Sequence, residues 1–145
     1  MACGVNPGCG NFSYSFSQNI GGQDISQSYS FNQQTGQMTD SFSDKNDLTG
    51  ATQSQSYSDN LFTGQGSESN SWADGCGDGG SQSHNWGPCP GDNSQSSSWY
   101  NACGFGGSES MNGNGNFSES SHSPWGSSSE SFNAWDPWSC CGGCC

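Results

Sequence analysis

The sequence contains no arginine and only one lysine, Lys45, against 13 acidic residues, and its formal net charge is −12. A chain with this balance cannot neutralise phosphate groups, so nucleic acids and anionic membrane surfaces are excluded as expected partners. Aliphatic side chains are almost as scarce. Leu, Ile, Val and Phe together supply 13 of the 145 residues. This is too few for a conventional hydrophobic core, and the composition is typical of disordered chains.

Targeting and membrane signals are also missing. The opening residues, MACGV, have neither the basic flank nor the apolar stretch of a secretory signal. No apolar run approaches the roughly 18 residues of a membrane span, so we expect no membrane insertion. Nine cysteines nevertheless favour an oxidising location. We therefore expect the protein outside the cell, or on a cell or spore surface, by an export route that the sequence leaves open.

A serine-rich unit recurs along the chain. The motif Ser-[Gln/Glu]-Ser begins at Ser26, Ser54, Ser67, Ser81, Ser94, Ser108, Ser118 and Ser129, and looser versions begin at Ser13 and Ser41. Most of these ten starts lie 13 or 14 residues apart, and the last two spacings are 10 and 11. A disordered tail has no reason to keep such a period, so the repeat outweighs the composition.

The unit has the pattern Ser-[Gln/Glu]-Ser-x-[Ser/Asn]-[Phe/Trp], followed by a variable stretch and a glycine. Alternation with period two, ended by a residue that tolerates positive φ, predicts a strand of about six residues and a turn. One face would be smooth and serine-lined, and the other bulky. We therefore predict an all-β fold, either a short-repeat β-solenoid of 13–14 residues per coil or a cross-β stack, with about ten rungs.

Two sets of residues carry this prediction. The serines expected to form a repeat ladder are Ser26, Ser28, Ser54, Ser56, Ser67, Ser69, Ser81, Ser83, Ser94, Ser96, Ser108, Ser110, Ser129 and Ser131. The aromatic residues expected to stack rung on rung are Phe31, Trp72, Trp86 and Trp99. We expect a single repeat array over residues 11–139, rich in Tyr and Gln over 11–66 and in Trp, Gly and Cys over 67–139. A Cys/Gly segment, 1–10, would precede it, and a Cys-rich tail, 140–145, would follow it.

The cysteines are candidates for cross-links. They are Cys3, Cys9, Cys76, Cys89, Cys103, Cys140, Cys141, Cys144 and Cys145. Cys76, Cys89 and Cys103 keep the period of the repeat, so we expect them above one another along one edge, at a spacing that suits disulfides. An odd total favours at least one intermolecular bond. Disulfides within the chain and a thiolate metal site in the terminal CCGGCC remain alternatives.

No catalytic or cofactor site is expected. His84 and His122 occupy variable positions of the unit, and serines are so common that a Ser-His-Asp coincidence carries no meaning. The acids Glu68, Glu109, Glu119 and Glu130 share the second position of the unit with glutamines. Stacked carboxylates would repel one another, so we expect these side chains to point outward.

The Ser/Gln/Asn/Gly repeats with aromatic positions, over about residues 12–135, resemble curlin-type functional amyloid subunits. That resemblance implies stacked strand-turn-strand repeats in an extracellular fibre, although curlin units are longer and lack these cysteines. The cysteine-rich ends look like those of disulfide-linked surface appendage subunits, such as those on bacterial spores.

The sequence therefore predicts a structural protein rather than an enzyme. A strand array with uncapped ends would stack on copies of itself and form an extracellular fibre, an amyloid-like filament or a surface coat. A monomeric β-solenoid that binds ice, mineral or metal is the alternative from another class, and a disordered matrix protein with incidental repeats is a third.

Overall fold

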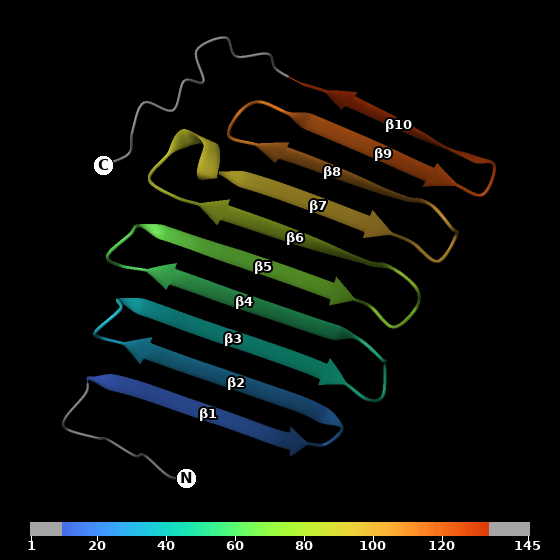
Figure 1. The fold of residues 1–145 in the computed structure, drawn as a ribbon. Coiled ribbons are helices and arrows are strands. Elements are labelled where there is room, and N and C mark those ends of the chain that lie inside the picture. The colour runs from blue at the N-terminus through green and yellow to red at the C-terminus, as the bar shows by residue number, and fades with distance from the viewer. Residues whose placement is uncertain (1–9, 134–145) are drawn as a thin grey trace.

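In the computed structural model, which describes residues 10–133, the chain forms one open antiparallel sheet of ten strands (Figure 1). The strands are β1 (Asn11–Ile20), β2 (Gln23–Asn32), β3 (Gln37–Asn46), β4 (Thr52–Asn60), β5 (Gln65–Ala73), β6 (Gly79–Trp86), β7 (Ser94–Tyr100), β8 (Gly106–Asn112), β9 (Phe117–Ser123) and β10 (Gly126–Phe132). One short 3-10 turn, η1 (Pro90–Asp92), lies between β6 and β7. Each strand pairs with the next along the chain. The all-β prediction, with about ten repeated strands, is confirmed.

The path of the chain differs from the expected coil. Each repeat supplies one strand and one turn, and the direction of the chain reverses at every turn. A parallel rung would need a crossover of a dozen or more residues, whereas strands of seven to ten residues leave only a few residues of each repeat for the connection. The sheet does not close on itself, and a solenoid is not confirmed.

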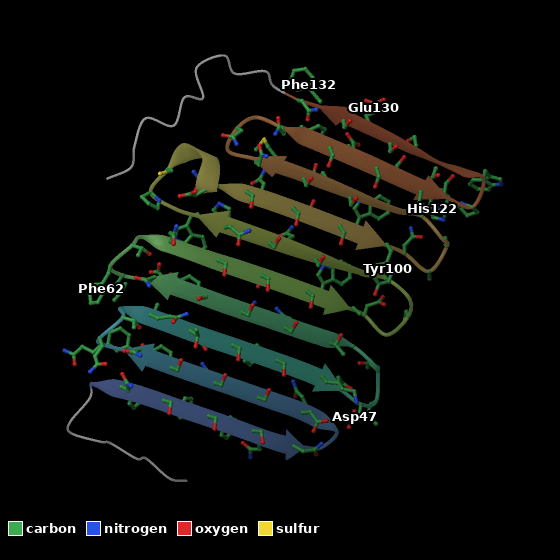
Figure 2. The ribbon with its side chains drawn as sticks, in the orientation of Figure 1. Asp47, Phe62, Tyr100, His122, Glu130 and Phe132 are labelled. Carbon is green, nitrogen blue, oxygen red and sulfur yellow. The ribbon has the colours of Figure 1, made fainter. Side chains whose placement is uncertain are left out.

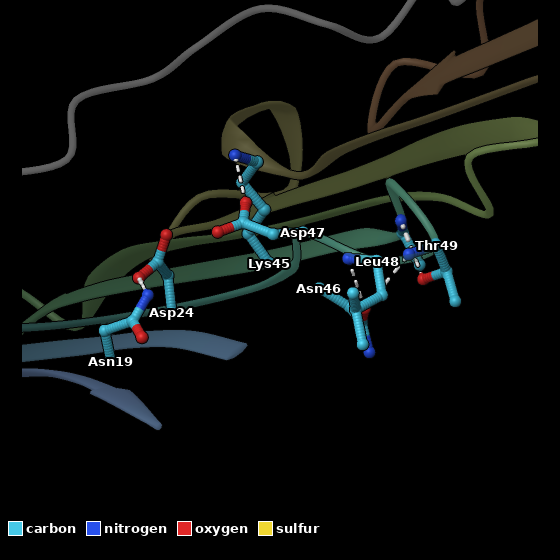
Figure 3. Close-up of polar contacts among 8 residues, drawn as sticks. Asn19, Asp24, Lys45, Asn46, Asp47, Leu48 and Thr49 are labelled. Atoms are coloured by element: carbon cyan, nitrogen blue, oxygen red, sulfur yellow. Dashed lines mark hydrogen bonds and ion pairs between the residues drawn. The ribbon is translucent and has the colours of Figure 1, made fainter. Parts of the chain in front are cut away.

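Six of the turns between strands begin with an Asn or Asp. In the turn after β3, the Asn46 Oδ1 accepts hydrogen bonds from the N–H groups of Leu48 (3.0 Å) and Thr49 (3.1 Å) (Figure 3). The N–H of Gly50 then donates to the Asn46 carbonyl (2.8 Å), with Gly50 at φ +73°. Such side-chain acceptors favour turns over continued strand. Asn32, Asn60 and Asp74 accept from the same two positions. Asn101 and Asn112 accept from the N–H groups two and four residues later.

Turns on the same side of the sheet, at the ends of the strands, also bond to each other. The N–H of Asp47 donates to the Gly22 carbonyl (2.7 Å), two strands away, and the N–H of Leu61 donates to the Gly36 carbonyl (2.9 Å) on the opposite edge. The turns after β5 and β7 are joined by a bond from the Ala102 N–H to the Asp78 Oδ1 (2.8 Å). The repeat is therefore continuous in the turns as well as in the strands.

Nothing in residues 10–133 covers either face of the sheet. No hydrophobic side chain in the described part of the chain is buried, and Phe132, Phe62 and Trp125 are 65%, 69% and 84% exposed (Figure 2). Residues 10–133 include no helix that is long and apolar enough to cross a membrane. A single layer with two open faces is not a fold that normally stands alone, because stable domains pack at least two layers around a core.

Candidate functional site

Two unbroken columns of serine cross the sheet on one face, which we call the serine face. The first serine column consists of Ser15, Ser28, Ser41, Ser56, Ser69, Ser83, Ser96, Ser110, Ser118 and Ser131. The second consists of Ser17, Ser26, Ser43, Ser54, Ser71, Ser81, Ser98, Ser108, Ser120 and Ser129. Every strand contributes one serine to each column. The serine face is therefore the most regular surface of the molecule.

The predicted ladder serines all lie on this face, in three columns. Most of them belong to the two serine columns, whereas Ser67 and Ser94 fall in a third column beside Asn85. Eight members of the two columns were not among the predicted ladder serines: Ser15, Ser17, Ser41, Ser43, Ser71, Ser98, Ser118 and Ser120. Antiparallel pairing brings the start of one Ser-x-Ser unit opposite the end of the next, and an alignment of the units in one direction hides this.

Hydroxyl pairs join the serine columns in alternate strand pairs. Ser26 bonds to Ser43 and Ser28 to Ser41, each at 2.7 Å, between β2 and β3. Equivalent pairs at 2.7 to 2.8 Å join β4 to β5, β6 to β7 and β8 to β9. Among the described residues, the column serines of β1 and β10 have no hydroxyl partner. The alternation thus leaves the two outermost strands as the unmatched members of the series.

The opposite face carries the charge, and we call it the mixed face. Its carboxylates are Asp40, Asp44, Asp59, Glu68, Glu109, Glu119 and Glu130, by the alternation of the strands. No lysine or arginine of the ten described strands lies there. Burial on this face, and then the charge of Asp59, raise the pKa of Tyr57. The mixed face is therefore strongly negative.

Charges on the serine face nearly cancel. Within the strands it holds only Asp24 and Lys45, which are directly opposite each other on β2 and β3. Lys45 also forms an ion pair with Asp47 in the next turn (Nζ to Oδ1, 2.6 Å), and this contact is the main cause of its raised pKa (Figure 3). The two faces of one sheet thus differ sharply in electrostatic character.

Three of the four glutamates of the repeat face one another instead of being spread out. Glu109, Glu119 and Glu130 are cross-strand neighbours on β8, β9 and β10. Glu68 lies in another column, opposite Tyr57 and His84. All four are on the exposed mixed face, and like charges directly opposite each other are destabilising. This end of the sheet therefore carries an electrostatic cost.

The expected rung-on-rung stacking of aromatic residues is wrong. Because the chain reverses at every turn, Phe31 and Trp86 lie toward one edge of the mixed face and Trp72 and Trp99 toward the other. Three tryptophans face a glycine on the neighbouring strand. The pairs are Trp72 with Gly80, Trp86 with Gly66 and Trp99 with Gly107. A Cβ on any of these glycines would lie within 3.0 Å of the indole, so the aromatic ring covers a position that only glycine leaves open.

The expected column of three cysteines is also wrong. Cys76 and Cys103 lie in turns at one edge of the sheet, whereas Cys89 lies in the turn at the opposite edge (Figure 1). Cys76 and Cys103 carry free thiols. Their turns contact each other, since a Cβ on Gly77 would lie 2.9 Å from the Ala102 Cβ, but no disulfide joins the two thiols. Cys3, Cys9, Cys140, Cys141, Cys144 and Cys145 lie outside the described residues.

The two histidines are far apart in the sheet. His84 is an exposed mixed-face residue on β6, and its ring centroid lies 5.6 Å from that of Trp86. His122 lies on the serine face near the end of β9 (Figure 2). Over residues 10–133, no three His, Cys, Asp or Glu side chains are grouped as metal ligands.

Comparisons with protein-family models, with curated protein sequences and with solved structures gave no match to this chain.

Proposed function

We propose that the chain is a structural, self-assembling subunit of an extracellular fibre, amyloid-like filament or surface coat. One observation carries this proposal: residues 10–133 form a single-layered sheet, and nothing in that part of the chain covers its two faces or its two edge strands. Ordering a backbone costs about 1 to 2 kcal/mol per residue, and burial of apolar surface normally offsets that cost. A sheet without a core gains buried surface and hydrogen bonds when copies of it associate.

The serine face is the surface on which two sheets pack. Serine side chains are small, so two such faces approach closely, as in a dry zipper. A hydroxyl both donates and accepts, so the face is complementary to a second copy of itself, whereas a carboxylate only accepts. Two mixed faces, each with seven carboxylates, repel each other. Sheets in the assembly therefore pair through their serine faces, and the acidic residues face solvent.

The serine face is large enough for this role. Ten strands about 4.8 Å apart and seven residues long span about 48 Å by 24 Å, or about 1,100 Å² per copy. A specific interface typically buries about 800 Å² per partner. Paired sheets with strands across the growth direction would form a cross-β stack.

Cysteines stabilise the assembly covalently. The start of β1 and the end of β10 lie on the same turn-bearing side of the sheet (Figure 1). When copies stack with β10 of one beside β1 of the next, these two strand ends are therefore neighbours. Two thiols of neighbouring copies form one disulfide by losing two electrons and two protons to an oxidant such as molecular oxygen. This chemistry also favours an extracellular or surface location.

Electron microscopy and sedimentation of the purified chain, across a range of concentrations and with or without reductant, test the proposal. Filaments or sheets that form above a threshold concentration are expected, and non-reducing gels should show covalent oligomers after oxidation. A folded chain that remains monomeric at high concentration contradicts the proposal and favours a monomeric binding protein.

A further inference from the structure

Each residue of a strand directs its backbone N–H and C=O toward one of the two neighbouring strands. We call the choice of neighbour the hydrogen-bonding phase, and it determines which backbone groups are exposed at the two edge strands. In an antiparallel sheet, the N–H and C=O of one residue point to the same neighbouring strand, and those of the next residue point to the other. All residues on one face of a strand therefore bond to the same neighbouring strand. Strand pairs joined through serine-face residues must then alternate with pairs joined through mixed-face residues.

Bonds that close the turns identify this phase. Across β8 and β9 the bond runs from the N–H of Asn112, a serine-face residue, to the carbonyl of Asn116 (3.1 Å). Across β7 and β8 it runs from the N–H of Asn101, which continues the mixed face, to the carbonyl of Phe105 (2.8 Å). Serine-face residues are thus directed toward each other in the same pairs that contain the hydroxyl contacts.

Both edges of the sheet expose the same kind of position. The N–H of Gln33, which continues the mixed face of β2, donates to the Gly10 carbonyl before β1 (3.3 Å). The serine-face residues of β1 therefore direct their backbone groups away from β2. With ten strands and nine alternating pairs, the serine-face residues of β10 also point outward. The β1 edge exposes Ser15 and Ser17, and the β10 edge exposes Ser129 and Ser131.

We propose that β10 of one copy pairs with β1 of the next in a single register, with Ser129 opposite Ser17 and Ser131 opposite Ser15. This inference rests on the proposed function and specifies its joint. The two strands run in opposite directions in one sheet, so a translated copy continues the antiparallel order. The register extends both serine columns from copy to copy. It also supplies the hydroxyl partners that these four serines lack within the described residues.

The joint is heterologous, because a β10 edge strand pairs with a β1 edge strand. Each copy has one edge strand of each kind, so growth continues without closure.

A proline at an outward-facing position removes only a donor that the monomer does not use. Ser17→Pro blocks the β1 edge, and Ser129→Pro blocks the β10 edge. Ser17→Ala is the matched control, because it removes the hydroxyl and keeps the N–H.

The test uses full-length chains under reducing conditions, with circular dichroism to verify the fold. We expect wild type and Ser17→Ala to form filaments. Each proline variant alone should form no filaments, because the only association left to it is the pairing of two serine faces. An equimolar mixture of the two proline variants should give edge-joined pairs, one copy of each variant, and no filaments, because only one complementary pair of edge strands remains. Filaments from either proline variant, or folded variants that do not associate with each other in the mixture, would overturn the joint. Failure of the wild type to assemble under any condition would instead overturn the proposed function.

A charge series tests the register if proline disturbs the fold. In the proposed joint, Phe16 of one copy lies opposite Glu130 of the next. At low ionic strength, Phe16→Lys should lower the critical concentration several-fold and Phe16→Glu should raise it several-fold. The same two changes at Ile20, opposite Gly126 in this register, should have little effect. Equal responses at the two positions, or no difference between lysine and glutamate at Phe16, would overturn the register.

Discussion

Trp72 lies directly opposite Gly80 on the neighbouring strand, and a Cβ on Gly80 would be 3.0 Å from the indole Nε1. The same Cβ would be 2.7 Å from the Ser98 carbonyl oxygen. Gly80 therefore has close neighbours on both adjacent strands although the described sheet has no core. A side chain at this position would displace the Trp72 indole or the β7 backbone.

Gly80→Ala should destabilise the sheet by about 1 to 3 kcal/mol, because the indole and the β7 backbone must move to admit a methyl group. The guanidinium unfolding midpoint and the tryptophan fluorescence maximum measure this effect. Gly91→Ala is the control, since its Cβ would meet only the amide end of Asn114, at 3.1 Å. Equal midpoints for the two variants would show that the indole does not depend on the glycine.

Asp74 should make the turn after β5 sensitive to acid. Its Oδ1 accepts from the N–H groups of Cys76 (2.7 Å), Gly77 (3.1 Å) and Asp78 (3.0 Å), and these bonds hold the pKa of Asp74 below its usual value. A lowered pKa in the folded state contributes stability above the unfolded-state pKa. That contribution is lost as the pH falls through the folded-state pKa.

Asp74→Asn separates charge from hydrogen bonding at this turn. Asparagine occupies the first position of five other turns and keeps the acceptor oxygen, so the variant should fold at neutral pH without the acid sensitivity of this turn. Asp74→Ala should lower the unfolding midpoint at all pH values above the unfolded-state pKa. An NMR titration in which the Asp74 carboxyl has an unshifted pKa would contradict this account.

Glu119→Gln should stabilise the C-terminal strands by about 0.5 kcal/mol, because Glu119 lies between Glu109 and Glu130 in one column. The gain should shrink as salt screens the repulsion. Glu68→Gln is the matched control, since its cross-strand neighbours are Tyr57 and His84. Chemical denaturation at low and high ionic strength distinguishes the two, and equal effects would argue against the three-carboxylate column.

A charge on the serine face should prevent sheet pairing. Ser96→Glu introduces a carboxylate in the middle of the first serine column, whereas Gln95→Glu places the same group one residue away on the mixed face. We expect Ser96→Glu to give single-layered filaments or none, and Gln95→Glu to pair as wild type does. Electron microscopy of filament thickness measures the outcome. The reverse result would assign the pairing to the mixed face.

The number of strands and their two unlike faces could be predicted from the sequence, because a period of two and ten repeat starts are local features. The direction of pairing could not be predicted from the serines. Ser-x-Ser is symmetrical, so Ser81 and Ser83 fit a neighbouring unit in either orientation. The length of the connection determines whether neighbouring strands are parallel or antiparallel, because the few residues left in each repeat suffice for a turn and not for a crossover.

The errors in the predicted site all follow from the assumption that neighbouring strands run in the same direction. With the chain reversed at each turn, Cys89 moves to the edge opposite Cys76, and Trp99 falls opposite Gly107 instead of above Trp86. Two signals in the sequence point to the observed arrangement. Pairs of glycines precede Ser81 and Ser108, each following a unit that ends in tryptophan. Asn-x-x-Thr-Gly also recurs at Asn32, Asn46 and Asn60, which marks tight turns.

X-ray diffraction from aligned filaments tests the central claim most directly. If copies join edge to edge through β10 and β1, the strands lie across the filament axis. The pattern should then contain a meridional reflection at about 4.8 Å and an axial repeat of about 48 Å, the height of ten strands. A 4.8 Å reflection on the equator would contradict the account, because the strands would then run along the filament and the sheet could not have grown from its edges.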